Sequence, residues 1–224
     1  MPVRFDPRID VLPLPQREIW RELAPAPRLS FVLYGGTAVA LHLGHRQSVD
    51  FDFFRSQPLD KDELRRAFAF VDSGTVIQDA PNTLVILAAT ASGTVKVSFF
   101  GHLAFGRVND PLLTRDGALL VASLEDLLAT KLKATLDRAE ARDYRDIAEM
   151  LAAGISLSRG LAAFSLMFKG GEPAAVLRAL GYFGDGDLDT LSEADRMTLR
   201  RARDEVKDLP ELKLKAGSLS VPLG

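Results

Sequence analysis

Hydrophobic and polar positions change their spacing twice between residues 31 and 54, and these changes predict a strand, a helix and a second strand. Residues 31–34 (FVLY) form a short apolar run that is typical of a buried strand. The pair Gly35-Gly36 interrupts this run, and a helix-like segment follows at 37–43. Residues 50–53 (DFDF) then alternate polar and apolar side chains at the period of a strand. We expect the rest of the chain to be built around this unit.

The remaining pattern predicts a mixed sheet flanked by helices, followed by a helical region. Strands are expected near 75–78, 83–90 and 94–100, and Ser92-Gly93 is typical of the hairpin turn between the last two. Residues 101–117 show no regular period. Capping boxes that begin at Asp60, Ser123 and Ser192 predict helix starts. The helix that begins at Asp60 is expected to run to about residue 70. Further helices are expected at 15–23, 144–151, 157–168 and from Pro173.

These elements predict an α/β (α+β) fold in three parts. A core at 25–122 carries the sheet, a helical region at 123–215 closes the cleft, and residues 1–24 form an N-terminal helical extension. The chain has 224 residues, of which 47% are hydrophobic, so its core is large enough for a globular protein.

Charge and cysteine content exclude some classes of protein. With 28 Lys and Arg against 30 Asp and Glu, the net charge of −2 gives no overall attraction to nucleic acid, so RNA contact requires a local basic patch. The absence of cysteine excludes disulfides and thiolate metal sites, and it fits a cytoplasmic protein. The longest apolar stretch, 84–91, is too short for a membrane span, and we expect no membrane partner.

Two aspartates and two glycines in the first unit of the pattern predict a nucleotide site. Side chains two apart on a strand share a face, so Asp50 and Asp52 lie side by side. Their oxygen ligands suit Mg²⁺ (or Mn²⁺), while backbone N–H groups at Gly35 and Gly36 face an anion. An ordinary strand–turn–helix–strand with two solvent-facing aspartates fits these residues equally well.

The whole run GGTAVALHLGHRQSVDFDFF resembles the AbiEii/AbiGii group of nucleotidyltransferases, the toxin halves of bacterial toxin–antitoxin pairs. The resemblance implies a polymerase-β-like core and transfer of a nucleotidyl group from an NTP, with Asp50 and Asp52 as metal ligands. Gly35, Gly36 and Thr37 would bind phosphate oxygens, and Arg46 and Ser48 also match the signature.

A second signature lies at 131–147. Its residues include Lys131, Arg138 and the segment 142–147 (RDYRDI), which resembles the family's Lys/Arg-Asp-x-x-Asp pattern. The resemblance places Lys131 and Arg138 near the triphosphate and Asp143 or Asp146 in the active site; a solvated helix face is the alternative for the two basic residues. The spacing of Asp143 fits an N-cap of the helix that follows. We therefore assign catalysis to Lys131 and Asp146 and interpret Asp143 as a cap.

One position departs from the family pattern. Related sequences often carry a third carboxylate on the strand beside Asp-x-Asp, as Val-Asp-Phe-Phe, whereas this chain has Val-Ser-Phe-Phe with Ser98. A serine hydroxyl is neither a carboxylate ligand nor a base. Either two acids suffice, or Asp79 or an acid beyond residue 140 replaces the third, or activity is weak.

The acceptor is not specified by the residues. The resemblance points to RNA, especially tRNA, or to a protein side chain, with a cognate antitoxin as a partner. A small-molecule nucleotidyltransferase of the antibiotic-modifying kind shares the Gly-Gly and Asp-x-Asp core and is one alternative. A non-catalytic NTP-binding scaffold protein, which would explain Ser98 directly, is the other.

Overall fold

The computed structural model describes residues 2–223, and the chain forms two compact units. The first contains the residues up to Gly106, Asp110–Ala122 and the residues from Ala216 on. The second contains Arg107–Asn109 and Ser123–Lys215. The described part of the predicted N-terminal extension, residues 2–24, therefore folds with the first unit, as do residues 216–223.

The first unit is built on a mixed sheet, which confirms the predicted fold class. Within residues 2–223 the sheet has eight strands in the order β1-β7-β8-β2-β3-β6-β5-β4. The strands are β1 (Arg4–Phe5), β2 (Val32–Tyr34), β3 (Asp50–Phe54), β4 (Thr75–Ala80), β5 (Thr83–Thr90), β6 (Gly93–Phe100), β7 (Leu112–Thr114) and β8 (Leu120–Val121). The central strand β3 runs antiparallel to β2 and parallel to β6. Strand β7 lies in the segment 101–117, where three residues are too few to show a period.

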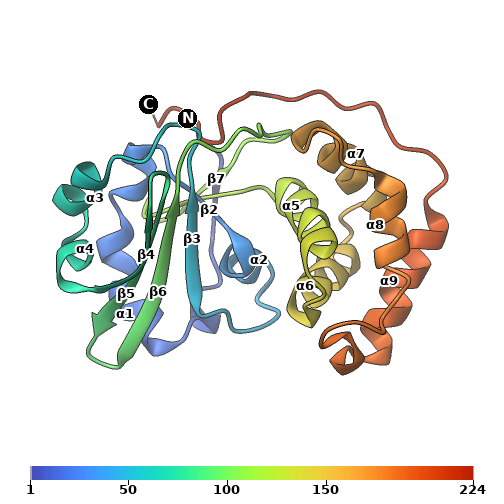
Figure 1. Ribbon diagram of the computed structural model, residues 1–224, viewed down its shortest axis with the longest axis horizontal. Coiled ribbons are helices and arrows are strands. Elements are labelled where there is room, and N and C mark those ends of the chain that lie inside the picture. The colour runs from blue at the N-terminus through green and yellow to red at the C-terminus, as the bar shows by residue number, and fades with distance from the viewer. Residues whose placement is uncertain (1, 224) are drawn as a thin grey trace. The chain divides into compact units, whose positions relative to one another are not determined.

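Helices cover both faces of this sheet. Figure 1 shows α2 on one face and α1, α3 and α4 on the other. The helical segments are η1 (Ile9–Val11), α1 (Leu14–Ile19), η2 (Trp20–Leu23), η3 (Ala26–Leu29), α2 (Gly35–Leu43), α3 (Lys61–Ala67) and α4 (Ala69–Ser73), where η marks a 3₁₀ helix. The single helix predicted at 15–23 is thus α1 followed by the 3₁₀ turn η2.

Two predictions for the segment 60–70 have different outcomes. Asp60 caps α3 as predicted, because its carboxylate accepts hydrogen bonds from the N–H groups of Asp62 and Glu63. The single helix is wrong, since Phe68 adopts an extended conformation between α3 and α4. The Phe68 ring is fully buried, with its centroid 5.2 Å from that of Phe99. Burial of the ring outweighs the cost of interrupting the helix.

The aromatic core lies on one face of β3. Phe51 and Phe53 are fully buried there, and Phe53 stacks on Phe99 of β6 with centroids 5.5 Å apart. Trp20 from η2 packs against Phe51 and donates a hydrogen bond of 2.8 Å from Nε1 to Asp116. Because side chains alternate along a strand, the neighbours of these phenylalanines point to the opposite face, where α2 lies.

The second unit is helical, as predicted. It contains α5 (Leu124–Asp137), α6 (Ala141–Ala152), α7 (Leu157–Met167), α8 (Pro173–Ala179), η4 (Leu188–Thr190) and α9 (Glu193–Glu205). Helix α5 packs against α6, α7 and α8, and α6 packs against α9. The predicted caps Ser123 and Ser192 are confirmed, since each hydroxyl accepts a hydrogen bond from a first-turn N–H.

A buried carboxylate joins the segment Arg107–Asn109 to the helical unit. Asp126 accepts hydrogen bonds from the N–H groups of Val108 and Asn109, at 2.8 and 3.1 Å, and from the Ser123 hydroxyl. Burial raises the pKa of Asp126 above its usual value, although these hydrogen bonds oppose the shift. Asp126 thus fixes the link between the units to the start of α5.

The aromatic core can be tested through Phe99, whose ring lies beside four other phenylalanine rings. Phe99→Ala should lower the free energy of unfolding by about 3–5 kcal/mol, because it leaves a cavity in a close-packed region. Fluorescence of Trp20, the single tryptophan, reports unfolding of the first unit in urea. Tyr182→Ala, at a side chain 59% exposed, is the control. Equal losses in the two variants would contradict this packing.

Candidate active site

The first helical residue after β2 lies directly beside Asp52. Gly35 has a φ of +75°, a conformation that side chains other than glycine rarely adopt. A Cβ atom at this position would lie 2.5 Å from Oδ2 of Asp52, which is too close for any side chain. Glycine therefore allows the N-terminus of α2 to approach the carboxylate.

Three more of the predicted residues converge on the same helix start. A Cβ atom on Gly36 would overlap Nη2 of Arg46 and lie 3.1 Å from Oγ of Ser48. The cap residue of α2, Tyr34, makes no side-chain hydrogen bond to the first turn. The N–H groups of this turn and the Arg46 guanidinium thus form a positively polarised region of the kind that binds phosphate.

Thr37 joins α2 to β3 through its side chain. Its buried hydroxyl lies 2.9 Å from the Ser48 hydroxyl and donates to the carbonyl of Asp50. A hydroxyl has one proton, and a carbonyl only accepts, so Ser48 is the donor to Thr37. In this structure the Thr37 hydroxyl makes these internal bonds, and the Thr37 backbone N–H lies in the first turn of α2, so phosphate binding by Thr37 stays a prediction.

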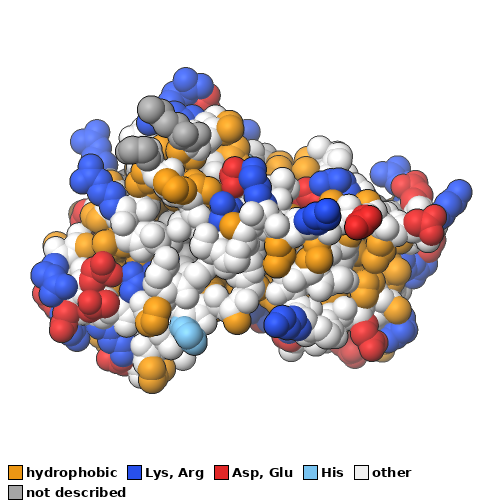
Figure 2. All heavy atoms as spheres, turned by 90° about the horizontal axis from the view of Figure 1, so that it is seen from above, with side chains coloured by type: hydrophobic (Ala, Val, Ile, Leu, Met, Phe, Trp, Pro, Cys, Tyr) orange, Lys and Arg blue, Asp and Glu red, His pale blue; other side chains and the backbone are white. Residues whose placement is uncertain are grey.

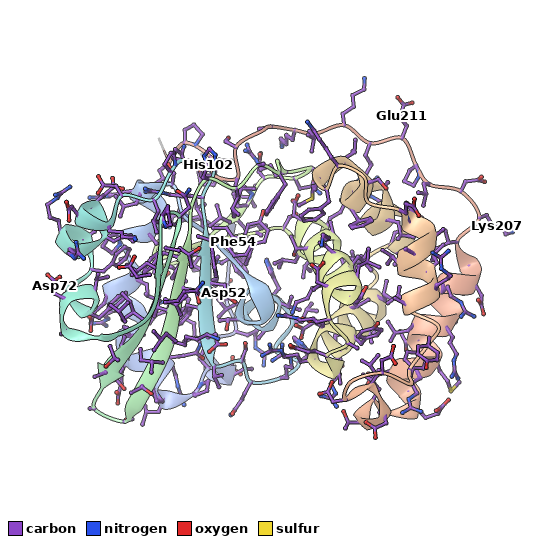
Figure 3. The ribbon with its side chains drawn as sticks, in the orientation of Figure 1. Asp52, Phe54, Asp72, His102, Lys207 and Glu211 are labelled. Atoms are coloured by element: carbon purple, nitrogen blue, oxygen red, sulfur yellow. The ribbon has the colours of Figure 1, made fainter. Side chains whose placement is uncertain are left out.

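Asp50 has a basic partner, Lys96, which was not among the predicted site residues. Lys96 Nζ lies 2.6 Å from Oδ2 of Asp50, and the two residues are register partners on the parallel strands β3 and β6. The sequence contained a signal for this pair. Lys96 lies two residues before Ser98, just as Asp50 lies two residues before Asp52, so both pairs come together when the two strands align. Figure 3 labels Asp52 and Phe54 on β3.

Ser98 occupies the position opposite Asp52. The two are register partners, and Ser98 is only 2% exposed. Asp79, considered above as a substitute acid, lies instead on the edge strand β4 and forms an ion pair with Lys61. Within residues 2–223 no group of three or more His, Cys, Asp or Glu side chains is placed to hold a metal ion.

Two protein carboxylates are nevertheless enough to bind Mg²⁺ when a substrate and water supply the other ligands. This ion usually keeps several waters and binds one or two carboxylates together with phosphate oxygens of a substrate. Asp50 and Asp52 supply oxygen donors on one face of β3, and Asp52 lies beside the N-terminal turn of α2. The donor chemistry therefore fits a substrate-bound divalent cation better than a metal held by protein ligands alone.

The residues of the second signature gather in the second unit. Lys131 Nζ lies 2.7 Å from Oδ1 of Asp143 and 2.6 Å from Oδ2 of Asp146. Both carboxylates are fully buried, and the Lys131 side chain is only 8% exposed, so the solvated-face alternative is wrong for this lysine. Arg138 follows the end of α5 in an extended conformation, and its Nε lies 2.8 Å from Oδ2 of Asp143.

The interpretation of Asp143 as a helix cap is wrong. Helix α6 begins at Ala141, with Glu140 at the cap position, so Asp143 lies inside the first turn. Burial by itself raises the pKa of Asp143, but the positive charges of Lys131 and Arg138 outweigh burial and hold that pKa below the usual value. Asp143 is thus an ionised member of a buried charge cluster that joins α5 to α6.

The site residues predicted from the sequence therefore form two groups. Gly35, Gly36, Thr37, Arg46, Ser48, Asp50 and Asp52 lie together in the first unit, and Lys131, Arg138 and Asp146 lie together with Asp143 in the second. Elsewhere, acidic and basic side chains are interspersed on the face in Figure 2, in accord with the net charge of −2. Among the described residues, no helix has both the length and the apolar character needed to cross a membrane.

Comparison with known proteins agrees with this geometry. A family model described as nucleotidyl transferase AbiEii toxin of type IV toxin–antitoxin systems matches residues 19–212. An uncharacterized protein of Aquifex aeolicus (strain VF5) is 29% identical over 119 residues, which are 52% of this chain and 55% of that protein. The match thus spans about half the length of this relative.

The buried charge cluster can be tested by removing its central cation. Lys131→Met leaves two buried carboxylates without that partner, and we expect a loss of about 3–5 kcal/mol in unfolding free energy. Lys133→Met is the matched control on the same helix, because Lys133 pairs with Asp137 at the surface. Urea denaturation followed by circular dichroism measures both variants. An equal effect of the two substitutions would contradict the structural role of Lys131.

Proposed function

Because the chain belongs to the family of AbiEii nucleotidyl transferase toxins of type IV toxin–antitoxin systems, we propose that it transfers a nucleotidyl group from an NTP. The observation that carries this proposal is the convergence of Asp52, Arg46 and the N-terminus of α2. In the reaction, the oxygen of an acceptor hydroxyl bonds to the α-phosphorus and its proton passes to solvent, while the bond from that phosphorus to the oxygen that bridges the α- and β-phosphates breaks. Pyrophosphate then leaves.

The first-unit residues divide this work by their chemistry. The first-turn N–H groups of α2 and the Arg46 guanidinium bind the β- and γ-phosphates. Asp50 and Asp52 would hold Mg²⁺ (or Mn²⁺), which would supply charge neutralisation for the triphosphate and the leaving pyrophosphate. Thr37 and Ser48 keep α2 and β3 in register with each other.

Lys96 has two positions in this proposal. Its ammonium pairs with Asp50 in the structure. If Asp50 held a divalent cation, Lys96 would lose this partner, and the phosphates would be the nearest anionic alternative. A lysine on the strand beside Asp50 thus supplies charge to the transferring group.

In the second unit we propose different roles for the two basic residues. Lys131 is buried between Asp143 and Asp146, which supports a role in holding α5 to α6 rather than direct phosphate contact. The Arg138 side chain is 46% exposed, which supports contact with an anionic substrate group. Asp146 forms an ion pair with Lys131 and shares this role of holding α5 to α6.

The acceptor and the partner are proposed from the family. RNA, especially tRNA, is the acceptor we favour over a protein side chain, and a cognate antitoxin is the expected partner of a type IV toxin. A small-molecule nucleotidyltransferase shares the same core and remains the alternative enzyme. Ser98 opposite Asp52 is the specific observation that favours a non-catalytic NTP-binding protein.

One experiment separates these alternatives. The protein is incubated with each radiolabelled NTP, Mg²⁺ and total RNA, and the products are resolved as RNA, protein and small molecules. Label in RNA is the expected result. Label in small products alone would favour the small-molecule enzyme, and NTP binding without any transfer would favour the scaffold protein.

Asp52→Asn should reduce nucleotidyl transfer by at least about a hundredfold, because it removes one of two metal ligands beside the phosphates. The fold should be retained, since Asp52 is not part of the aromatic core. Asp79→Asn, at an exposed aspartate on β4, is the control and should leave transfer unchanged. Full Mg²⁺-dependent activity of Asp52→Asn would refute the two-carboxylate site.

Substitutions at Ser98 test whether two acids suffice. Ser98→Ala should cost little activity, because a neutral hydroxyl contributes roughly one hydrogen bond of about 1 kcal/mol. Ser98→Asp places a carboxylate opposite Asp52, and we expect half-maximal activity at a lower Mg²⁺ concentration. Rates at saturating NTP over a range of Mg²⁺ concentrations measure both effects. A large loss in Ser98→Ala would mean that the serine itself positions a reacting group.

A further inference from the structure

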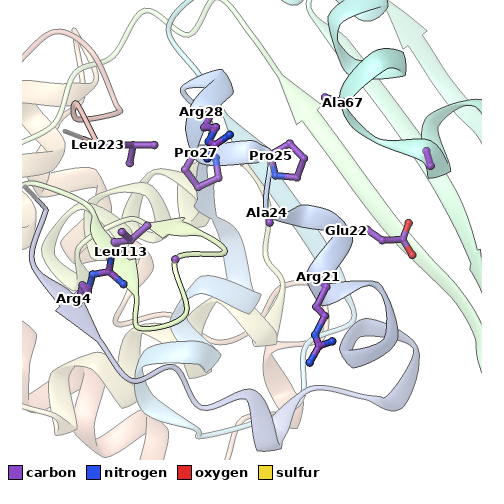
Figure 4. A pocket seen from close by; sticks show the side chains of 12 residues that line it. Arg4, Arg21, Glu22, Ala24, Pro25, Pro27, Arg28, Ala67, Leu113 and Leu223 are labelled. Carbon is purple, nitrogen blue, oxygen red and sulfur yellow. The ribbon is translucent and has the colours of Figure 1, made fainter.

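A cavity of the first unit lies on the other side of the sheet from Asp52. It has a volume of about 760 Å³ and is formed by β1, β7, η2, η3 and the junction of α3 with α4 (Figure 4). Trp20 of η2 and Phe68 between α3 and α4 pack against Phe51 and Phe99, which lie on the face opposite the carboxylates. A ligand in this cavity is therefore separated from the proposed nucleotide site by the sheet.

Positive charge is concentrated around this cavity. Arg4, Arg21 and Arg28 line it, with Glu22 as the one acidic residue of the lining. The Arg21 and Arg28 side chains make no hydrogen bond or ion pair to any residue in 2–223, and Arg4 donates to a backbone carbonyl, that of Arg115. All three arginines are exposed, so the rim of the cavity presents positive charge to solvent, and positive charge attracts an anion.

The walls restrict the kind of anion. Ala24, Pro25, Pro27 and Leu113 give the cavity an apolar surface between the arginines. Its volume falls within the range of roughly 300–1,000 Å³ that is typical of small-ligand sites, so a bare ion would leave most of it unfilled. Two prolines in and before η3 hold this wall in one conformation, which lowers the entropy cost of binding.

We propose that this cavity binds a phosphate monoester with an apolar or aromatic body. The dianionic phosphate pairs with guanidinium groups through two parallel hydrogen bonds each, a geometry that arginine favours. The organic body packs against the proline and alanine wall. A carboxylate ligand would bring a single negative charge and leave more of the positive charge uncompensated.

Phenyl phosphate is a simple probe of this class. Titration calorimetry of the full chain at low salt, without Mg²⁺, should show binding that weakens as salt is added. Inorganic phosphate should bind more weakly and phenol should not bind, because each lacks one half of the proposed contacts. No binding of phenyl phosphate to the wild type, or equal affinity for inorganic phosphate, would overturn the proposal.

Variants locate the site. Arg21→Gln and Arg28→Gln should each weaken the binding of phenyl phosphate by about tenfold or more, because each removes a charge-assisted hydrogen bond. Arg17→Gln removes the same charge from an exposed arginine outside the cavity and should have no such effect. Equal weakening by Arg17→Gln would mean general charge attraction. Weakening by Arg46→Gln in place of Arg28→Gln would mean binding at the nucleotide site, and either result would overturn the proposal.

Discussion

The alternation of aspartate and phenylalanine along β3 is the constraint on which the structure of the first unit depends. Phe51 and Phe53 are buried between the sheet and its helices, so a slip of one residue would expose both rings and bury two carboxylates. The cost of that exchange fixes the register of β3 against β2 and β6. The same packing that forms the core therefore directs Asp50 and Asp52 to the face of the sheet where α2 begins.

On that face of the sheet, each carboxylate lies next to a group of positive charge. The N-terminus of α2 and Arg46 provide positive potential beside Asp52, and Lys96 balances Asp50. Lys96 partly neutralises this pair of carboxylates. In the proposed function, a metal–triphosphate complex would supply a cation for the carboxylates and an anion for the basic groups. That proposal therefore assigns the site to the whole complex rather than to either component.

The elements of the central motif could be predicted from the sequence, but the residues that pair with its side chains could not. Local alternation and the Gly-Gly pair predicted β2, α2 and β3 to within two residues at each end, since these signals are short-range. The family resemblance placed the strand of Ser98 beside β3, but the pairing of Lys96 with Asp50 also depends on the register of the two strands, which local pattern does not specify. Asp143 illustrates the same limit: its spacing fits a cap, and only the packing of α5 on α6 shows that it pairs with Lys131. The break at Phe68 likewise arises from tertiary burial.

The location of the metal tests the central claim most directly. Crystals of the protein grown with Mn²⁺ and a non-hydrolysable NTP analogue would give an anomalous signal that marks the ion. We predict a peak within coordination distance of both Asp50 and Asp52, with phosphate oxygens at the start of α2 and Lys96 displaced from Asp50. A peak elsewhere, or a bound nucleotide with the Lys96–Asp50 ion pair intact and no metal between the two aspartates, would contradict it.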